Sequence, residues 1–390
     1  MNLSTAKAAV AGLPWMVFAG YMSSSALSTS HLQVHFRHTI AIALFVCSSL
    51  TLSGCALHRQ PSLPVVFRGA QTLEGRRLPN QRDYWTAFRA PSRFNATGLY
   101  LLEPYRPDRI PLILIHGLAS DALTWEETIV SLKCHPEINS RYQIWCYQYP
   151  TGNSYLKAAA DLRQELIKTR ATLDPSKSNP AFDQTVLVGH SMGGLVAKLQ
   201  ASHSDDKLWG AVYSTQLDAI ATSTPVPNET ASAILFDPVP FVKKVVYIAA
   251  PQHGSNWTVN AIGRFGQWLI EIPEQVQDDY IGRVRGNPGW FSGPGFRPPT
   301  SIDHLYPGSS IMRAMSQLRK GDRVSAHSII GTGYFLPDGY TGDGVVAVAS
   351  AHVPDVQTEF FVQATHSGIL RNQAAASELV CILLIRAESP

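Results

Sequence analysis

The sequence predicts an α/β domain in which helices cover both faces of a mostly parallel central sheet. Two observations support this class. Short apolar runs alternate with helical patterns over much of the chain, and such alternation produces parallel strands joined by right-handed crossovers. In addition, the run from Pro111 to Ile115 is apolar at every position, which is typical of a strand buried on both faces.

The expected elements follow one another in a regular order. Strands are expected over residues 98–102, 111–115, 142–149, 186–189, 245–249, 328–331 and 359–362. Helices are expected over residues 125–132, 158–173, 195–199 and 368–385. In the helix over 158–173, apolar periodicity predicts that Leu162, Leu166 and Ile167 share one buried face.

Two stretches interrupt the alternation, and we expect them to form cap or lid insertions. They cover about residues 202–242 and 251–322, and both are longer than a crossover requires. The second contains Val259, Ile262, Phe265 and Leu269 at helical spacing. This apolar stripe has two interpretations: it packs on the core, or it covers the site as part of an aromatic lid.

The segment Gly189-His190-Ser191-Met192-Gly193 lies between a predicted strand and a predicted helix. A serine in this context occupies a sharp turn that exposes its hydroxyl at the carboxyl edge of the sheet. Gly189 and Gly193 supply backbone that can approach closely because it carries no side chain. The segment therefore predicts that Ser191 is a nucleophile.

A serine nucleophile requires a base and an acid, and a strand-turn-helix site of this kind carries them in the order serine, acid, histidine. His366 is the expected base because it follows the last predicted strand directly and precedes the final helix. Asp343 is the expected acid because glycines on both sides allow a sharp loop, and Asp338 is its main rival. The other histidines after the serine have weaker contexts: His203, His253, His304, His327 and His352.

The negative charge that develops during acyl transfer requires two backbone N–H donors. One is expected from Met192, directly after the serine. The other is expected from Leu118, in the loop that follows the strand over 111–115. Gly117 lets this loop turn beneath the substrate carbonyl, and His116 is expected to brace the loop without transferring a proton.

Together these motifs resemble the α/β-hydrolase superfamily, in particular its bacterial lipase, phospholipase and esterase branch. The similar segments are Ile-His-Gly-Leu at 115–118, Gly-His-Ser-Met-Gly-Gly at 189–194, Gly-Asp-Gly-Val-Val at 342–346 and Ala-Pro-Gln-His-Gly-Ser at 250–255, together with Thr365-His366. The resemblance implies an α/β-hydrolase fold and hydrolysis of carboxylic esters without a cofactor. Some members of this branch hold calcium, but the sequence contains no acidic cluster that would predict a metal site.

The N-terminal part of the chain predicts export. The apolar run 39–47 follows Arg37 and His38, and Leu52-Ser53-Gly54-Cys55 resembles a lipoprotein cleavage site. We therefore expect a leader over 1–54, a lipid-anchored tether over 55–95 beginning at lipidated Cys55, and the hydrolase domain over 96–390. An ordinary cleaved signal and an uncleaved anchor are the alternatives. Alanine at position 56 favours the outer membrane.

Cysteine content and charge add two further expectations. Export leaves Cys134, Cys146 and Cys381 besides Cys55, and either Cys134 pairs with Cys146 or all three are buried thiols. The formal net charge of +3 gives no argument for nucleic acid.

The sequence as a whole predicts a membrane-anchored serine hydrolase that cleaves lipid or other apolar acyl esters. Two alternatives use the same fold. One is an acyltransferase in which an alcohol or amine replaces water, and the other is a non-catalytic envelope lipoprotein.

Overall fold

The computed structural model describes residues 63–79, 83–213, 228–256, 270–286, 291, 297–336 and 338–385. The chain divides into two units, Met1–Pro61 and Ser62–Pro390, and all the described residues belong to the second. The predicted leader over 1–54, the lipidation site at Cys55 and the stripe from Val259 to Leu269 lie outside the described residues.

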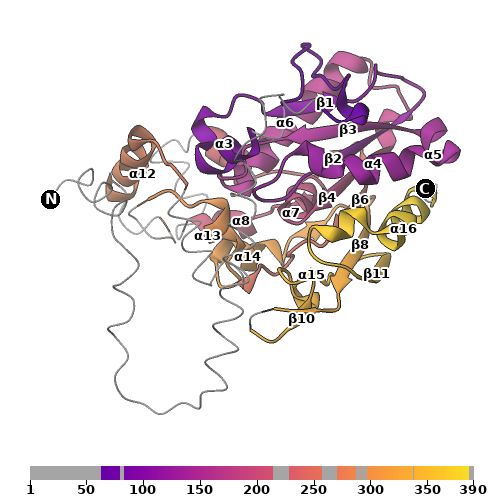
Figure 1. Ribbon diagram of the computed structural model, residues 1–390. Helices are drawn as coiled ribbons and strands as arrows, with labels where there is room; N and C mark the ends of the chain where they lie inside the picture. The colour runs from indigo at the N-terminus through magenta and orange to yellow at the C-terminus, as the bar shows by residue number, and fades with distance from the viewer. Residues whose placement is uncertain are drawn as a thin grey trace, which may run out of the picture. The chain divides into compact units, whose positions relative to one another are not determined.

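The described residues contain a seven-stranded sheet in the order β1-β3-β2-β4-β6-β8-β11 (Figure 1). The strands are β1 (Gly98–Leu101), β2 (Ile110–Ile115), β3 (Tyr142–Gln148), β4 (Thr185–His190), β6 (Val242–Ile248), β8 (Ser325–Thr332) and β11 (Thr358–Gln363). Only β1 runs antiparallel to its neighbour, and the other strand pairs of this sheet are parallel. The predicted fold class is confirmed.

Helices lie on both faces of this sheet. One face is covered by α4 (Glu126–Lys133), α5 (Pro136–Arg141) and α16 (Gln373–Leu384), and the other by α6 (Tyr155–Leu173), α7 (Met192–Lys198), α8 (Lys207–Val212), α10 (Asn228–Ile234) and α14 (Ser310–Met315). The described part of the chain also forms α3 (Asp83–Arg89), α12 (Glu274–Gly286), α13 (Ser301–Leu305) and α15 (Val348–Ala351).

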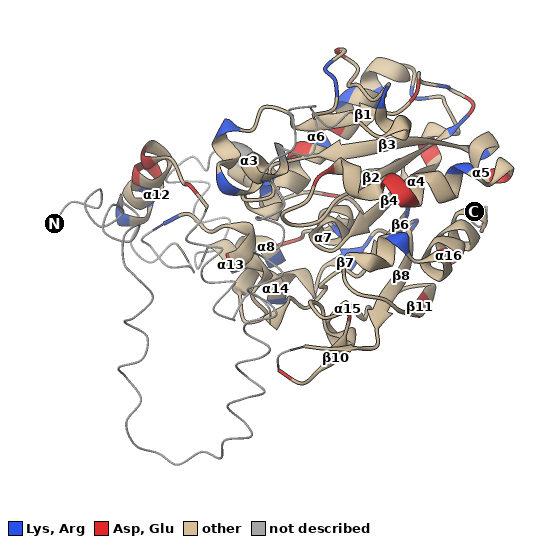
Figure 2. Ribbon diagram, viewed as in Figure 1, with Lys and Arg blue, Asp and Glu red and all other residues tan. Residues whose placement is uncertain are grey.

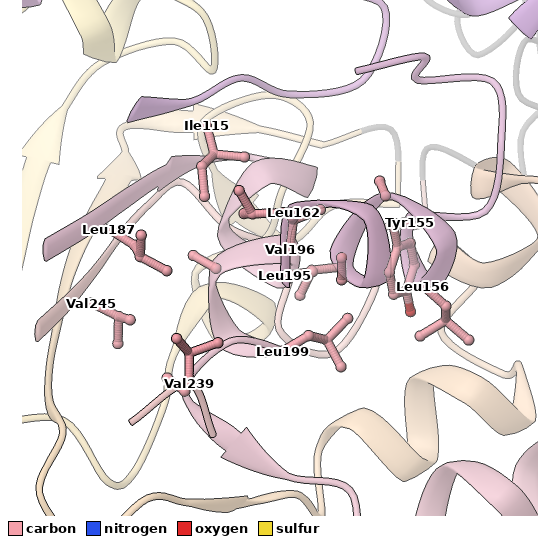
Figure 3. Packing of buried hydrophobic residues seen from close by; sticks show 14 of the residues in the cluster. Ile115, Tyr155, Leu156, Leu162, Leu187, Leu195, Val196, Leu199, Val239 and Val245 are labelled. Atoms are coloured by element: carbon pink, nitrogen blue, oxygen red, sulfur yellow. The ribbon is translucent and has the colours of Figure 1, made fainter. Parts of the chain in front are cut away.

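The central strand β2 shows why its sequence is apolar throughout. Ile113 and Ile115 belong to the core shared with α6 and α7, whereas Leu112 and Leu114 belong to the core shared with α4 and α16. Each of these side chains is fully buried, and such burial stabilises the fold by about 1.5–3 kcal/mol per side chain. Figure 3 shows Ile115 on the α7 side, with Leu195 and Val196.

Helix α6 corrects one sequence prediction. Leu162 and Leu166 are fully buried, but Ile167 is 54% exposed. A helix turns by about 100° per residue, so the position directly after Leu166 lies on a different side of the helix. Leu156 and Tyr155 complete the buried face instead (Figure 3).

The segment before β1 is folded onto the domain. Phe67, Ala70 and Leu78 are buried in the core that also contains α4 and α16. In α3, the carbonyl oxygen of Ala87 accepts a hydrogen bond from the N–H of Gly152 at 3.0 Å. The folded domain therefore begins before the predicted boundary at residue 96, and the described residues of the expected tether over 55–95 pack against it.

The described parts of the two predicted insertions differ in burial. Leu208, Ile234, Ile311 and Met312 belong to the main core, and strands β5 (Ser202–His203) and β7 (Arg319–Lys320) pair with each other. Helix α12, in contrast, has no buried residue. The segments that contain Leu208, Ile234, Ile311 and Met312 therefore pack on the core. A lid function for the rest of the two insertions stays a prediction.

The cysteines correct a second prediction. Cys134, Cys146 and Cys381 are free thiols. Cys146 points into the core from β3, whereas Cys134 ends α4 at the surface, so the two do not pair. The alternative of three buried thiols holds for Cys146 alone, because Cys134 and Cys381 are exposed.

Two further observations concern the distribution of charge and the length of apolar helices. Figure 2 shows basic and acidic residues interspersed along the ribbon rather than gathered on one element. Among the described residues, no helix is both long enough and apolar enough to cross a membrane.

Candidate active site

Ser191 lies in the turn between β4 and α7, with φ 54° and ψ −128°. For a residue with a side chain, such a conformation costs about 1–3 kcal/mol of free energy. The turn is held by two backbone hydrogen bonds: the N–H of Ser191 donates to Ile248 at 2.9 Å, and its carbonyl accepts from Gly194 at 2.9 Å. The side chain remains partly accessible to solvent.

The glycines around Ser191 are required by backbone contacts. A Cβ atom at Gly189 would lie 2.2 Å from the carbonyl oxygen of Gly193, and one at Gly193 would lie 2.2 Å from that of Ile115. Both distances are far below van der Waals contact, so any side chain would force strands β2 and β4 away from α7. The motif is therefore a packing requirement of this turn.

The structure brings Ser191, His366 and Asp343 into one chain of hydrogen bonds. His366 Nε2 lies 2.8 Å from Ser191 Oγ, and His366 Nδ1 lies 2.7 Å from Asp343 Oδ2. Because a carboxylate oxygen can only accept, His366 carries its proton on Nδ1 and presents the Nε2 lone pair to the serine hydroxyl. This is the arrangement that activates a serine.

Asp343 is held by main-chain hydrogen bonds to one oxygen of its carboxylate and to its own carbonyl. Its Oδ1 accepts from the N–H of Val345 at 2.9 Å and from that of Val346 at 2.7 Å. Its own carbonyl accepts from the N–H of His366 at 3.0 Å. With its side chain 1% exposed, the carboxylate has one orientation, and its second oxygen faces the imidazole.

The loop after β2 packs directly against the serine. A Cβ atom at Gly117 would lie 2.9 Å from Ser191 Cβ. Ala119 has φ 50°, and its N–H donates to Thr151 Oγ1 at 3.2 Å. The N–H groups of Leu118 and Met192 donate to no acceptor among the described residues, which leaves both available to a ligand.

His116 braces this loop from below. Its Nδ1–H donates to the carbonyl of Gly117 at 3.1 Å, its ring stacks on Tyr149 at 4.4 Å, and its own carbonyl accepts from the Tyr149 hydroxyl at 2.7 Å. Burial lowers the pKa of His116 to about 4. The imidazole is therefore neutral at neutral pH and does not contact the serine hydroxyl.

Three of the five described non-glycine residues with positive φ angles lie at the carboxyl edge of the sheet. These are Ala119, Ser191 and Ala249, which follow the neighbouring strands β2, β4 and β6; the other two are Lys177 and Asp205. Strain of this kind persists only where the surrounding structure imposes it, and it concentrates at functional sites. It marks the same edge that carries the hydrogen-bonded chain.

The rival candidates do not join this chain. Asp338 is exposed and accepts a hydrogen bond from Asn256. The remaining histidines have partners elsewhere: His203 with Asp237, His253 with Ser350, His304 with Ser154, His327 with Thr358 and His352 with Glu359.

The sequence pattern gave no role to His190, which lies directly before Ser191. In the structure its Nε2 donates to the carbonyl oxygen of His366 at 2.9 Å, and its ring lies 4.9 Å from that of His366. One signal in the sequence could have identified it: a polar residue at the end of an apolar strand must find a hydrogen-bond partner when it is buried.

Within the described part of the chain, no group of three or more histidine, cysteine, aspartate or glutamate side chains is arranged to hold a metal ion.

The chain belongs to the alpha/beta hydrolase family, whose model matches residues 112–378. The fold and this match together define it as an α/β hydrolase. No curated protein matches the chain.

Several solved structures are similar to it at low identity. The mature lipase BlEst2 of Bacillus licheniformis is 14% identical with a TM-score of 0.43, covering 73% of this chain and 95% of the lipase. Phospholipase PlaB of Legionella pneumophila is 13% identical with a TM-score of 0.45, covering 72% of this chain and 60% of PlaB. A hydrolase of Pseudomonas aeruginosa PA01 is 11% identical with a TM-score of 0.37, covering 74% of this chain and 94% of that one.

Proposed function

We propose that this chain is a serine hydrolase that cleaves carboxylic esters with apolar acyl groups. One observation carries the proposal: Ser191 Oγ, His366 and Asp343 form a continuous hydrogen-bonded chain with distances of 2.8 Å and 2.7 Å. A serine-histidine-aspartate chain of this kind forms an acyl-enzyme, and the tautomer required for that step is the one that Asp343 imposes here.

In the first half of the reaction, Ser191 Oγ attacks the ester carbonyl carbon while His366 Nε2 takes its proton. The negative oxygen that results accepts hydrogen bonds from the N–H groups of Leu118 and Met192. When the carbonyl re-forms, the C–O bond to the alcohol breaks, and the leaving alkoxide receives from His366 Nε2 the proton that came from Ser191.

In the second half, water replaces the alcohol. His366 Nε2 takes a proton from water as the water oxygen attacks the acyl carbon. The ester bond to Ser191 then breaks, and the serine oxygen regains its proton from His366. Asp343 stays ionised throughout and fixes the orientation of the imidazole.

The proposal of an apolar acyl group is supported by an apolar cluster beside the loop that follows β2, which carries Gly117 and Leu118 and is called the oxyanion loop below. The side chain of Leu118 packs against a buried cluster of Phe88, Ile270 and Ile302. These residues come from α3, from the stretch before α12 and from α13. An acyl chain that extends from a carbonyl bound at Leu118 would therefore meet the partly exposed Leu118 side chain with this apolar cluster behind it, which favours apolar over charged substituents.

The first experiment is labelling of the full chain with a fluorophosphonate probe. The parent should be labelled, Ser191→Ala should not, and Ser176→Ala, which removes an exposed serine hydroxyl, should be labelled like the parent. Absence of labelling in the folded parent would contradict the proposal and favour a non-catalytic lipoprotein.

The substrate class is tested with p-nitrophenyl esters of increasing chain length, with and without detergent. We expect kcat/KM to rise from acetate toward longer acyl groups, since each buried CH₂ contributes about 0.8 kcal/mol. A decrease over the whole series would contradict an apolar acyl site.

An acyltransferase is the second candidate, because an alcohol or amine can replace water in the second half of the reaction. Product analysis in the presence and absence of an added alcohol separates the two. A transferred acyl group as the main product, under conditions where free acid is minor, would favour the transferase.

We also propose that Cys55 is lipidated and that the chain is anchored in the bacterial cell envelope, in the outer membrane. The sequence Leu52-Ser53-Gly54-Cys55 supports this. Several acyl chains on one cysteine give stable anchoring, whereas a single chain does not. Metabolic labelling with an alkyne fatty acid should mark the parent and not Cys55→Ser, and equal labelling would contradict the proposal.

A further inference from the structure

We propose that His190 is a positioning residue, which holds the base of the reaction by hydrogen-bonding to the backbone of His366. The inference rests on the proposed function, because it assigns His366 as the base. It adds a role for the residue directly before Ser191.

The position of His366 is determined at both of its main-chain groups. Its N–H donates to the carbonyl of Asp343 at 3.0 Å, and its carbonyl accepts from His190 Nε2 at 2.9 Å. The first bond ties the base to the acid. The second ties it to β4, the strand that ends at the nucleophile.

The donor direction of the second bond is fixed by chemistry. A carbonyl oxygen only accepts, so His190 must carry its proton on Nε2. Nδ1 is then a bare acceptor, and it is buried with no hydrogen-bond partner. A Cβ atom at Gly117 would lie 3.3 Å from this nitrogen, so Nδ1 faces the backbone of the oxyanion loop.

The His190 ring is enclosed by three parts of the site. Gly117 lies on one side, the ring of His366 lies 4.9 Å away on another, and Trp125 meets it edge-on at 6.5 Å. The residue is 5% exposed. Because the ring is confined in this way, it fixes the distance between strand β4 and the loop that carries His366.

The consequence concerns the contact between His366 Nε2 and Ser191 Oγ. His190 and Ser191 are consecutive in the chain, so the bond to the His366 carbonyl links base and nucleophile through a single side chain and one peptide unit. Without that bond, the main chain of His366 keeps only its hydrogen bond to the Asp343 carbonyl, and the nearest other backbone anchor of the loop is the bond from Ala364 to Thr332. A displacement of the imidazole by about 1 Å would lower the rate by about 100-fold.

The test compares variants at position 190 in the full chain. His190→Leu removes the donor, His190→Gln places an amide nitrogen as many bonds from Cβ as Nε2, and His190→Asn places it where Nδ1 lies. We expect Leu and Asn to lower kcat by about 10- to 100-fold with KM changed less than about threefold, and Gln to restore most of kcat. The control is His203→Leu, which removes a histidine that is hydrogen-bonded to Asp237 and not to the chain of Ser191, His366 and Asp343. It should leave both constants unchanged.

Two outcomes at this position would overturn the inference. One is a His190→Leu enzyme with parental kcat. The other is a variant pair in which Gln and Asn lose kcat equally, which would indicate a packing role. If the parent itself shows no Ser191-dependent labelling, the proposed function fails instead, and the two failures are thereby distinguished.

A second measurement does not depend on activity. In the parent labelled with ¹⁵N-histidine, His190 should show the Nε2–H tautomer with a slowly exchanging proton, and His366 the Nδ1–H tautomer. His190→Gln assigns the signal by its loss. An Nδ1–H tautomer at His190 would contradict the hydrogen bond and with it the inference.

Discussion

The two halves of the candidate active site are built in different ways. The nucleophile half consists of β2, β4 and the turns around Gly117 and Ser191, and its strands are buried at every position. The acid-base half consists of β8, β11 and the loops that carry Asp343 and His366. In this half β8 is buried at its six inner positions, whereas β11 is buried at one position only, and its Phe361 is 50% exposed.

The two halves differ in what holds Ser191 on one side and Asp343 and His366 on the other in position. In the nucleophile half, backbones touch where a Cβ atom would not fit, as at Gly189 and Gly193. In the acid-base half, hydrogen bonds hold the loops, as from Val345 and Val346 to the Asp343 carboxylate. A Cβ atom would not fit at Gly342 either, where it would lie 2.1 Å from the Val346 carbonyl oxygen, but this contact stays within one loop. Close packing tolerates almost no substitution, whereas a hydrogen-bonded loop tolerates changes that keep its donors and acceptors.

The largest effect is expected at the carboxylate of the acid-base half. Asp343→Asn keeps an acceptor for Val345 and Val346 but presents an amide to His366, which favours the wrong tautomer. We expect kcat/KM to fall by about 10³- to 10⁴-fold with only a small loss of stability. Ester hydrolysis and urea unfolding measure the two quantities, and Asp338→Asn is the control that should leave both unchanged.

The next effect compares a tightly packed turn of the nucleophile half with an open loop position of the acid-base half. Gly189→Ala places a Cβ atom 2.2 Å from a carbonyl oxygen, whereas at Gly344, with φ 93°, a Cβ atom meets nothing within 4 Å. We expect Gly189→Ala to lose about 3–5 kcal/mol of unfolding free energy, and Gly344→Ala only about 1 kcal/mol, from backbone strain. Equal losses in urea titrations would show that the backbone contact at Gly189 adds nothing to the cost of the substitution.

The smallest effect concerns pH. Burial lowers the pKa of His116 to about 4 and that of His190 to about 3, from 6.5. Between about pH 6.5 and pH 4 the unfolded chain therefore binds protons that the folded chain does not, and stability falls as pH falls. Each histidine contributes at most about 1.4 kcal/mol per pH unit in this window.

His116→Asn tests this linkage, because asparagine can donate to the Gly117 carbonyl but does not titrate. Urea midpoints at pH 7 and pH 5 should lie closer together in the variant than in the parent. An unchanged difference between the two midpoints would show that His116 does not remain neutral through burial.

Much of the fold could be predicted because the evidence for it is local. The run from Pro111 to Ile115 indicated a strand buried on both faces, and the structure buries it so. Ser191 could be named as a candidate because the glycines that its turn requires are neighbours in sequence. Asp343 and His366 could be named from the order of the chain, and their catalytic roles stay predictions.

Other features could not be predicted because they depend on distant contacts. Phe67 and Phe88 lie in a segment with no clear pattern, and only their packing against α4 and the oxyanion loop shows that it is folded. Cys134 and Cys146 are close in sequence, but β3 carries Cys146 into the core while Cys134 stays at the surface. Ile167 lies on the solvent side of α6.

By itself the sequence determined the strands, the helices and the tight turn at Ser191, because apolar periodicity and missing side chains act between residues that are close along the chain. Only the tertiary structure decided that β8 and β11 lie side by side, so that Asp343, His366 and His190 meet. That meeting depends on strand order and loop direction, which are set by the packing of the whole domain and not by any one segment.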